Sequence, residues 1–494
     1  MPGVLLIGLA AAPALAAILN LIFRRPRPAE FINLFASAVV LACAGPLPIF
    51  ASQSRRLYWG GYIVLDGLAA WVVLCTAVVY FLSSLFAVGY MRTLDEDQRL
   101  PWFYTLFPAF ALTTLIAPLI NNIGVYWIAI ELTTLVSTFL VAFERTAENM
   151  EAAWKYIMVV SAGISLALLG VVLFYWAGTF VLGPTYDLTW DALRAAAPKM
   201  SPALVTLAFL LSLVGYGTKA GLAPMHTWLP DAHSESPAPV SAMLSGALLN
   251  AAMVGIVRFL GVTNAAHVGG LTHAVVVVFG LASLGVGTLF IVRQEGVKRL
   301  MAYSSVEHMG VIALGFGFGG LFGTAGALFH MFNHSLNKSL MFFGAGSAMR
   351  SFGTKEIAGI RAFGHHFPTA GALWLAGAVS ITGAPIFALF LSEITIMRGG
   401  MAQSFAWAVW VMAILLIVVF VGFLNHFRAM FYEAEVGFYE AEVGGAVKPA
   451  PISAWCVIPM ILAVVPLLVF GFWWPERLWT YFGTIWAAIK GGGW

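Results

Sequence analysis

Hydrophobic runs of about 20 residues follow one another along nearly the whole chain, and they constrain its fold more than any other feature. A run of this length, folded as a helix, crosses the ~30 Å hydrocarbon core of a bilayer. Charged residues make up only 10% of the 494 residues, against about 25% in soluble domains. The chain therefore leaves no room for a soluble catalytic domain, and we predict an all-α polytopic membrane protein.

The runs predict about fourteen transmembrane helices, several of them joined by very short loops. Short loops require neighbouring helices to pack antiparallel. The expected spans cover residues 3–23, 31–51, 63–88, 102–120, 122–143, 154–178, 203–222, 238–261, 271–293, 299–319, 322–348, 370–397, 404–431 and 454–474.

The lysines and arginines of the loops give the orientation. If the N-terminus lies outside, most of them fall in the inner loops, among them Arg24, Arg92, Arg145, Arg293 and Arg350. Because cytoplasmic loops carry the excess of Lys and Arg, we expect a multi-pass protein of the inner (cytoplasmic) membrane with both termini in the periplasm. Their scatter through short loops gives no sign of nucleic-acid binding.

Two segments lie outside the spans. The tandem YEAEVGF–YEAEVGG at Tyr432–Gly445 falls in an inner loop, where a duplication is easily tolerated. The tail after Pro475 carries Trp479, Tyr481, Phe482 and Trp486, which is typical of a short helix at the membrane interface.

The cysteines argue against a redox centre in this chain. Cys43, Cys75 and Cys456 stand singly, which supports neither an iron–sulfur cluster nor a structural zinc site. No glycine-rich nucleotide motif follows a strand pattern. We therefore expect no cofactor, and any redox chemistry would belong to partner subunits.

A lysine at a helix break is the first sign of function. In the stretch Gly215–Val240, Lys219 follows an apolar run, Pro224 comes soon after, and His226 and His233 trail the lysine at seven-residue steps. A buried ammonium beside a broken helix is a feature of ion and proton paths through membranes.

Glu131 lies in the middle of another apolar run, YWIAIELTTLVS. A carboxylate buried in a membrane needs a partner, and we expect that partner to be Lys219. The alternative is an ion pair that only holds two helices together, although such a pair often adds no stability over apolar packing.

The span at 322–348 carries a polar stripe. Its members His330, Asn333, His334, Asn337 and Lys338 share one helix face, which must point into the protein or towards water. The spacing of His330 and His334 also suits a metal ion, but no third ligand is evident and Lys338 would repel a cation. A proton relay is the preferred interpretation, because histidine exchanges protons near neutral pH.

Two further spans add titratable groups. Glu307 and His308 lie in AYSSVEHMG, and Glu393 ends SITGAPIFALFLSE, where Gly383 and Pro385 interrupt the helix. The broken spans that carry Lys219 and Glu393 are five spans apart, and an odd offset inverts orientation.

This offset predicts two inverted five-helix repeats and divides the chain into four parts. The parts are residues 1–101 with three N-terminal helices, residues 102–262 and 263–432 with one repeat each, and residues 433–494 with an inner loop, the last span and the interfacial tail.

The run KAGLAPMHTWLPDAHSESPAPVSA, together with KRLMAYSSVEHMG, resembles the signatures of the antiporter-like membrane subunits of respiratory complex I and related complexes. Three segments, SSVEHMG, HMFNHSLNKSLMFFGAG and PIFALFLSE, are most similar in sequence to the F-type subunits of hydrogenase-4, which belong to the group 4 membrane-bound hydrogenases. The resemblance implies that Glu131 is the family's essential glutamate, Lys219 its broken-helix lysine and Glu393 its terminal acidic site. His226 and His233 match the family's two histidines. At the family's usual lysine in the eighth span, this chain has Asn250, which holds water but no charge.

These features predict a proton-translocating subunit of a membrane oxidoreductase, of the complex I or energy-converting hydrogenase type. We expect other membrane subunits and a peripheral redox arm as partners. Protons would enter near Glu131 and Lys219, step past Asn250, cross by His308, His330, His334 and Lys338, and leave near Glu393. A subunit of a multisubunit Na⁺/H⁺ antiporter and a purely structural membrane anchor stay open as alternatives. A solute carrier fits less well, because the polar residues form a row and not one midplane pocket.

Overall fold

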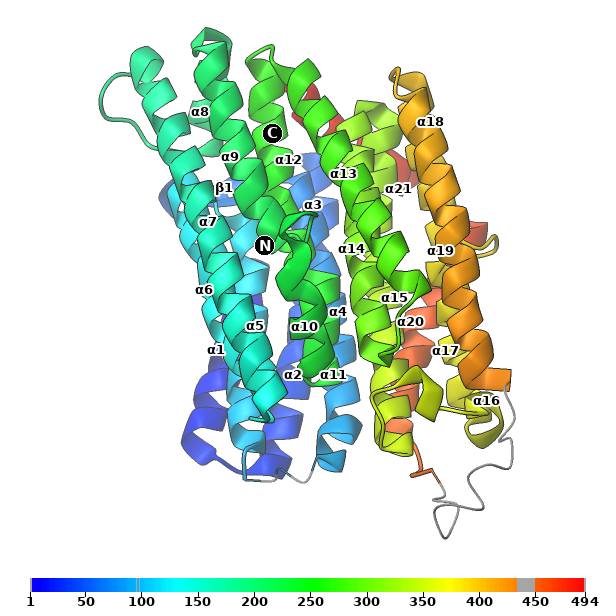
Figure 1. Cartoon of the computed structure of the whole chain (residues 1–494). Helices are drawn as coiled ribbons and strands as arrows, with labels where there is room; N and C mark the ends of the chain where they lie inside the picture. Colours follow the sequence, from blue (N-terminus) through cyan, green and yellow to red (C-terminus); the bar gives the residue numbers. More distant parts are fainter. Residues whose placement is uncertain (1, 95, 97, 433–448, 493–494) are drawn as a thin grey trace.

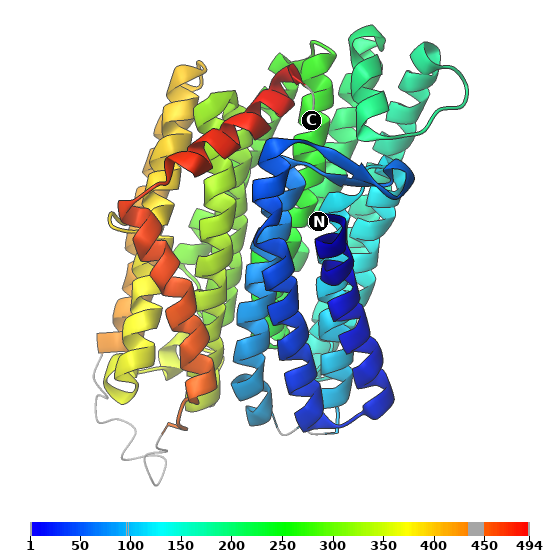
Figure 2. The same cartoon turned by 180° about the vertical axis from the view of Figure 1, so that it is seen from behind.

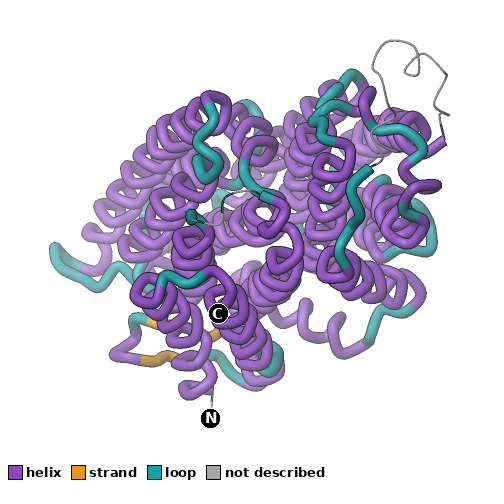
Figure 3. Tube along the Cα trace, turned by 90° about the horizontal axis from the view of Figure 1, so that it is seen from below, coloured by secondary structure: helices purple, strands orange, loops and turns teal. Residues whose placement is uncertain are grey.

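The computed structural model describes residues 2–94, 96, 98–432 and 449–492, and almost all of them lie in helices (Figures 1 and 3). Long helices run side by side in one bundle, and in the described residues the strands form only a small antiparallel hairpin, β1 (Arg56–Tyr58) with β2 (Ile63–Leu65). The predicted all-α polytopic fold is confirmed.

The helices follow one another in a simple order. They are α1 (Pro2–Phe23), α2 (Pro26–Ala44), α3 (Leu47–Gln53), α4 (Gly67–Tyr90), α5 (Leu100–Ile116), α6 (Ile123–Val141), α7 (Ala147–Leu182), α8 (Trp190–Ala196), α9 (Pro202–Lys219), α10 (Trp228–Glu235), α11 (Ala238–Met243), α12 (Leu249–Ala265), α13 (Gly269–Val292), α14 (Val297–Phe318), α15 (Gly320–Phe352), α16 (Phe363–His366), α17 (Pro368–Ile381), α18 (Ala388–Ala402), α19 (Ala406–Tyr432), α20 (Ala454–Phe472) and α21 (Glu476–Ala487).

Each predicted span coincides with a helix or with two consecutive ones. Within the described residues, eleven helical segments are long and apolar enough to cross a membrane. The span predicted at 31–51 is divided between α2 and α3, and a π-helical turn, Leu244–Leu248, joins α11 to α12. The number of crossings, fourteen, stays a prediction.

Ion pairs gather the predicted inner loops at one end of the bundle. Arg350 lies 3.2 Å from Glu144, Lys355 lies 2.7 Å from Glu235, and Asp231 accepts from both Lys155 and Arg299. These pairs join loops that are far apart in sequence, so the loops assigned to one side of the membrane do share one end of the molecule.

The β1–β2 hairpin and α21 lie at the opposite end of the bundle, and the start of α1 lies beside the hairpin (Figure 2). Tyr481 of α21 donates its hydroxyl to the carbonyl of Gly67 at 2.6 Å, and Phe482 packs edge-on against Trp71 with ring centroids 4.9 Å apart. The predicted tail helix therefore exists and covers the end of α4. Most of the tandem at Tyr432–Gly445 lies outside the described residues, so its interpretation is untested.

The centre of the bundle is formed by α4, α11, α12, α14 and α15, whose side chains are buried nearly all round. The outer helices α1, α7 and α19 instead present large apolar side chains on the surface of the chain, as membrane or subunit contacts require. Arg258 of α12 pairs with Asp66 at 2.8 Å, and both side chains are almost fully buried.

Two helices are interrupted where the sequence predicts breaks. After α9 ends at Lys219, Gly221 takes a left-handed φ of 75°, and the chain resumes as α10. After α17 ends at Ile381, Gly383 takes a φ of 66° before α18 begins. Glycine adopts this conformation without steric cost. Both breaks are confirmed, whereas the inverted repeats stay a prediction.

Candidate functional site

The first group of polar residues, here called the lysine cluster, surrounds Lys219 at the end of α9. Its ammonium is fully buried and donates to Thr134 Oγ1 at 2.8 Å and to Tyr156 Oη at 2.9 Å. The Thr134 hydroxyl lies 3.3 Å from Glu131 Oε2, to which it donates. Ser161 Oγ donates to the other carboxylate oxygen of Glu131 at 2.6 Å.

The expected partnership of Glu131 and Lys219 is therefore indirect. No direct ion pair joins these two side chains, and the Thr134 hydroxyl lies between them, accepting from the ammonium and donating to the carboxylate. The reason is that α6 carries both Glu131 and Thr134 one turn apart, so the shorter side chain reaches the lysine first. A hydroxyl in this position accepts a hydrogen bond from one group and donates one to the other, so it can relay a proton between them.

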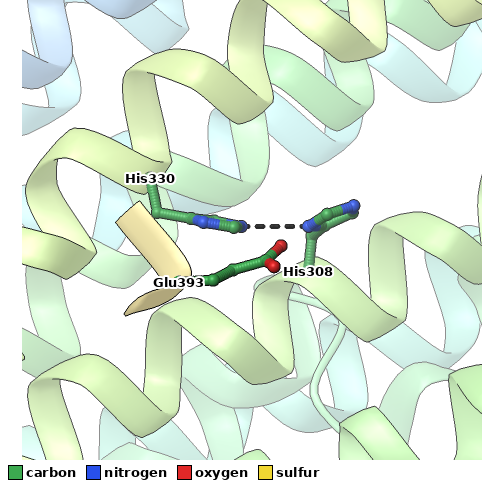
Figure 4. Close-up of side chains that lie close together, drawn as sticks. All are labelled: His308, His330 and Glu393. Atoms are coloured by element: carbon green, nitrogen blue, oxygen red, sulfur yellow. Dashed lines mark hydrogen bonds between the residues drawn. The ribbon is translucent and has the colours of Figure 1, made fainter. Parts of the chain in front are cut away.

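The second group, here called the histidine cluster, lies where α14, α15 and the break before α18 meet (Figure 4). His308 Nδ1 and His330 Nε2 face one another at 2.9 Å, and a single proton is shared between them. His330 Nδ1 lies 2.9 Å from Ser392 Oγ, and His308 Nε2 lies 3.2 Å from a carboxylate oxygen of Glu307. The Glu393 carboxylate points at the two rings.

Two more members of the stripe on α15 extend this cluster. The ring of His334 lies 5.6 Å from that of His308, and neither of its nitrogens has a hydrogen-bond partner among the described residues. Lys338 is fully buried, and its ammonium donates to Ser304 Oγ and, at 3.2 Å, to the carbonyl of Met301. The stripe therefore faces the protein interior, as its spacing predicts.

His233 lies between the two clusters. It is fully buried without a hydrogen-bond partner in the described part of the chain, and it is near enough to His334 and Lys338 to interact with them electrostatically. On its other side the ring of Trp228 lies 6.0 Å away, and Trp228 in turn packs on Tyr156 at 4.8 Å. No hydrogen-bonded chain connects the clusters through the described side chains.

Three predicted residues have different surroundings. His226 is partly exposed at the break after α9 and contacts neither cluster by any described interaction. Asn250 donates to Ser335 Oγ at 3.0 Å and to the carbonyl of Gly246 at 3.1 Å, beside the π-helical turn. Asn337 donates to the carbonyl of Gly377. Asn250 thus links α12 to Ser335 of α15, and Asn337 holds the backbone of α17.

Sequence reasoning missed the hydroxyls of the site. Thr134, Tyr156 and Ser161 complete the lysine cluster, while Ser304 and Ser392 hold the ends of the histidine cluster. Thr134 could have been found from its place one turn after Glu131. Ser304 and Ser392 likewise lie close in sequence to Glu307 and Glu393. Tyr156 and Ser161 lie on another helix, α7, and hydroxyls are too common to single out there.

Sequence comparisons place the chain among known membrane proteins. Residues 121–421 match the family model described as NADH:quinone oxidoreductase/Mrp antiporter, TM. A hydrogenase-4 component F homolog from Methylacidiphilum infernorum is 36% identical over 351 residues, which are 70% of this chain and 74% of that protein.

Two solved structures share the fold. A chain of the membrane-bound sulfane sulfur reductase, an archaeal respiratory membrane complex, superposes with a TM-score of 0.87 at 23% identity, over 99% of this chain and 98% of that one. A chain of the Mrp complex from Dietzia sp. DQ12-45-1b gives 0.85 at 21% identity, over 99% and 97%. The whole described bundle is therefore one known architecture.

Proposed function

Because the chain belongs to the NADH:quinone oxidoreductase/Mrp antiporter transmembrane family, we propose that it translocates protons as a subunit of a membrane oxidoreductase of the energy-converting hydrogenase type. The observation that carries this proposal is the row of buried titratable side chains between the two helix breaks, from Lys219 by His233 and His334 to Glu393. Burying a charged side chain in a membrane costs free energy, so such residues usually have a function there.

The lysine cluster is the entry. Glu131 is partly exposed on the face of α6, next to Ile128 and Leu132, which expose 56% and 45% of their surface. Protons, or the charge of a neighbouring subunit, can therefore reach Glu131 from outside the chain. The Thr134 hydroxyl couples this carboxylate to Lys219. If the carboxylate moves away, the charged ammonium loses a favourable Coulomb interaction and releases its proton more readily.

The histidine cluster is the transfer segment. A proton released from Lys219 crosses the Trp228 region by water to His233, then passes to His334, His308 and His330. Imidazoles suit this role, because each ring accepts a proton at one nitrogen and donates from the other. The buried carboxylates Glu307 and Glu393 stabilise the extra positive charge on the rings and lead it to the break before α18.

A polar pocket supports an exit at the predicted periplasmic end. It has a volume of about 360 Å³ and opens between the ends of α12, α14, α15 and α18, lined among others by Asn264, His273 and Gln403. We place both termini on this side, in the periplasm of a bacterial inner membrane. We also assign the exposed apolar faces of α1, α7 and α19 to lipid or to other membrane subunits, with the redox centres in a peripheral arm.

Glu131→Gln in the assembled complex tests the function. The variant keeps the shape of the side chain and the bond from Ser161 but cannot balance the charge of Lys219, so we expect redox-driven proton uptake in proteoliposomes to fall by at least about tenfold. Subunit composition on native gels is the control for assembly. Intact proton translocation in an assembled variant complex would remove Glu131 from the path and would overturn the mechanism.

The same proteoliposomes separate protons from sodium. The histidine cluster is rich in imidazole nitrogen, whereas Na⁺ prefers oxygen ligands, so we expect transport without Na⁺ at an unchanged rate. Transport that requires Na⁺ would favour the antiporter alternative. Unchanged transport after neutralising both Lys219 and Glu393 would favour the structural anchor.

A further inference from the structure

We propose that His308, His330 and Glu393 bind a divalent transition-metal ion, and that Zn²⁺ at this site stops proton transfer through the histidine cluster. One ligand atom from each of the three residues lies within 4.8 Å of the other two, and all three side chains are buried (Figure 4). Two imidazoles and one carboxylate form a ligand set that suits zinc, with one position left for water.

The facing ring nitrogens lie close to the separation that two ligands of one metal ion need. His308 Nδ1 and His330 Nε2 lie 2.9 Å apart and share one proton, so a metal ion that takes both lone pairs displaces this proton. Only a small separation of the rings is needed, because ligand nitrogens on tetrahedral zinc lie roughly 3.3 Å apart at Zn–N distances of about 2.0–2.1 Å. The ion thus replaces the proton that the relay would carry.

The outer nitrogen of His330 is held from behind, because His330 Nδ1 lies 2.9 Å from Ser392 Oγ. Metal-binding histidines almost always make such a contact with their other nitrogen. His308 Nε2 lies 3.2 Å from Glu307 Oε2 but forms no hydrogen bond with the described residues. The Ser392 contact therefore fixes the His330 ring before any metal arrives, while Glu307 places a carboxylate beside the His308 ring.

Glu393 supplies the third ligand from α18, beside the helix break. Its Oε1 is buried without a hydrogen-bond partner among the described residues. Gly383, with its left-handed φ, lies directly against this carboxylate, and a Cβ at that position would overlap it. In the same break, Pro385 and Ile386 are exposed on the surface of the chain.

The local charges permit a cation. Lys338 would repel one, but its ammonium is directed to Ser304 and to the carbonyl of Met301. Against it stand two buried carboxylates, Glu307 and Glu393, which together neutralise a divalent ion. The pair that sequence spacing suggests, His330 with His334, is not the pair that faces one ligand position.

Zn²⁺ binding to the full-length chain in detergent is the direct test, and it does not depend on the proposed function. The background variant His365→Gln/His366→Gln removes an adjacent histidine pair at a partly exposed helix, whose rings lie 5.8 Å apart. We expect equilibrium dialysis to find one Zn²⁺ per chain, and X-ray absorption to find N/O ligands at about 2.0–2.2 Å without sulfur.

Ligand variants locate the ion. Glu393→Gln and His330→Gln are expected to weaken Zn²⁺ binding by at least about 100-fold, and Ser392→Ala by about 10–100-fold, since it keeps all three ligands but loses one support. His273→Gln changes a mostly buried histidine near the start of α13; it is the matched control and should bind Zn²⁺ normally. Binding that survives both ligand variants, or no binding to the background chain, would overturn the proposal.

A spectroscopic test on the background chain does not depend on whether the ligand variants fold. Co²⁺ in the background chain should give the intense visible bands of a four-coordinate site, and Zn²⁺ should displace them. In proteoliposomes, Zn²⁺ should inhibit proton transport, and Ser392→Ala should raise the inhibitory concentration by the same factor as the dissociation constant. If Zn²⁺ bound without inhibiting transport, the metal site would stand, but its three ligands would not lie on the proton path.

Discussion

The lysine cluster and the histidine cluster occupy the two breaks of the fold, but they hold their protons in different ways. At the first break, one ammonium is coupled to a carboxylate through a hydroxyl, and the carboxylate reaches the surface of the chain. At the second, two imidazoles share a proton while two carboxylates and a lysine lie around them, all buried. The first arrangement suits a trigger that an outside charge can move, whereas the second suits transfer and storage.

The difference extends to the glycines at the breaks. Gly221 and Gly383 share the left-handed conformation, with φ of 75° and 66°. A side chain at Gly221 would overlap the end of Leu229, a flexible apolar residue, whereas one at Gly383 would overlap the Glu393 carboxylate. The first break therefore needs glycine for its backbone, and the second needs it for its site as well.

Lys219→Met gives the largest expected effect and tests whether the lysine cluster is the trigger. Methionine fills the space of the lysine stem, and an apolar replacement of a buried charge is often tolerated by the fold. We expect the complex to assemble and proton translocation in proteoliposomes to fall by at least about 100-fold. Lys338→Met is the comparison, because among the described residues this lysine donates only to Ser304 and to a backbone carbonyl. Equal losses of proton translocation in the two variants would contradict the assignment of the trigger to the lysine cluster.

Gly383→Ala and Gly221→Ala compare the breaks with a matched substitution. Each places alanine at positive φ, at a cost of about 1 kcal/mol or more in stability. Only Gly383→Ala also displaces the carboxylate, so we expect about a tenfold loss of transport there and less than about twofold for Gly221→Ala at equal assembled complex. Thermal unfolding measures the shared strain. A larger transport loss in Gly221→Ala than in Gly383→Ala would show that transport depends more on the backbone at the first break than on the position of the Glu393 carboxylate.

Much of this fold was predictable, because apolar runs and helix breakers are local properties of the sequence. Spans, both breaks and the buried stripe of α15 follow from run length, Gly–Pro placement and 3.6-residue periodicity. The pairing of side chains was not predictable. Periodicity put His330 beside His334, yet the structure sets His330 against His308 of another helix, and Thr134 between Glu131 and Lys219. Which side chains meet across helices depends on helix rotation and depth, and these are set by packing of the whole bundle.

His233→Gln and His226→Gln give the smallest expected effects and test whether the clusters communicate. The two histidines follow Lys219 at equal steps, yet His233 is fully buried near His334 and Lys338, while His226 is partly exposed beside neither cluster. Glutamine cannot take up a proton, so His233→Gln should slow translocation by several-fold, up to about tenfold, as water replaces the ring. His226→Gln should leave the rate within about twofold, because its ring supports no contact of the path. Single-turnover proton release from the complex resolves such differences. If His226→Gln slowed release more than His233→Gln, protons would leave the lysine cluster along the surface of the break, and the two clusters would act as separate paths.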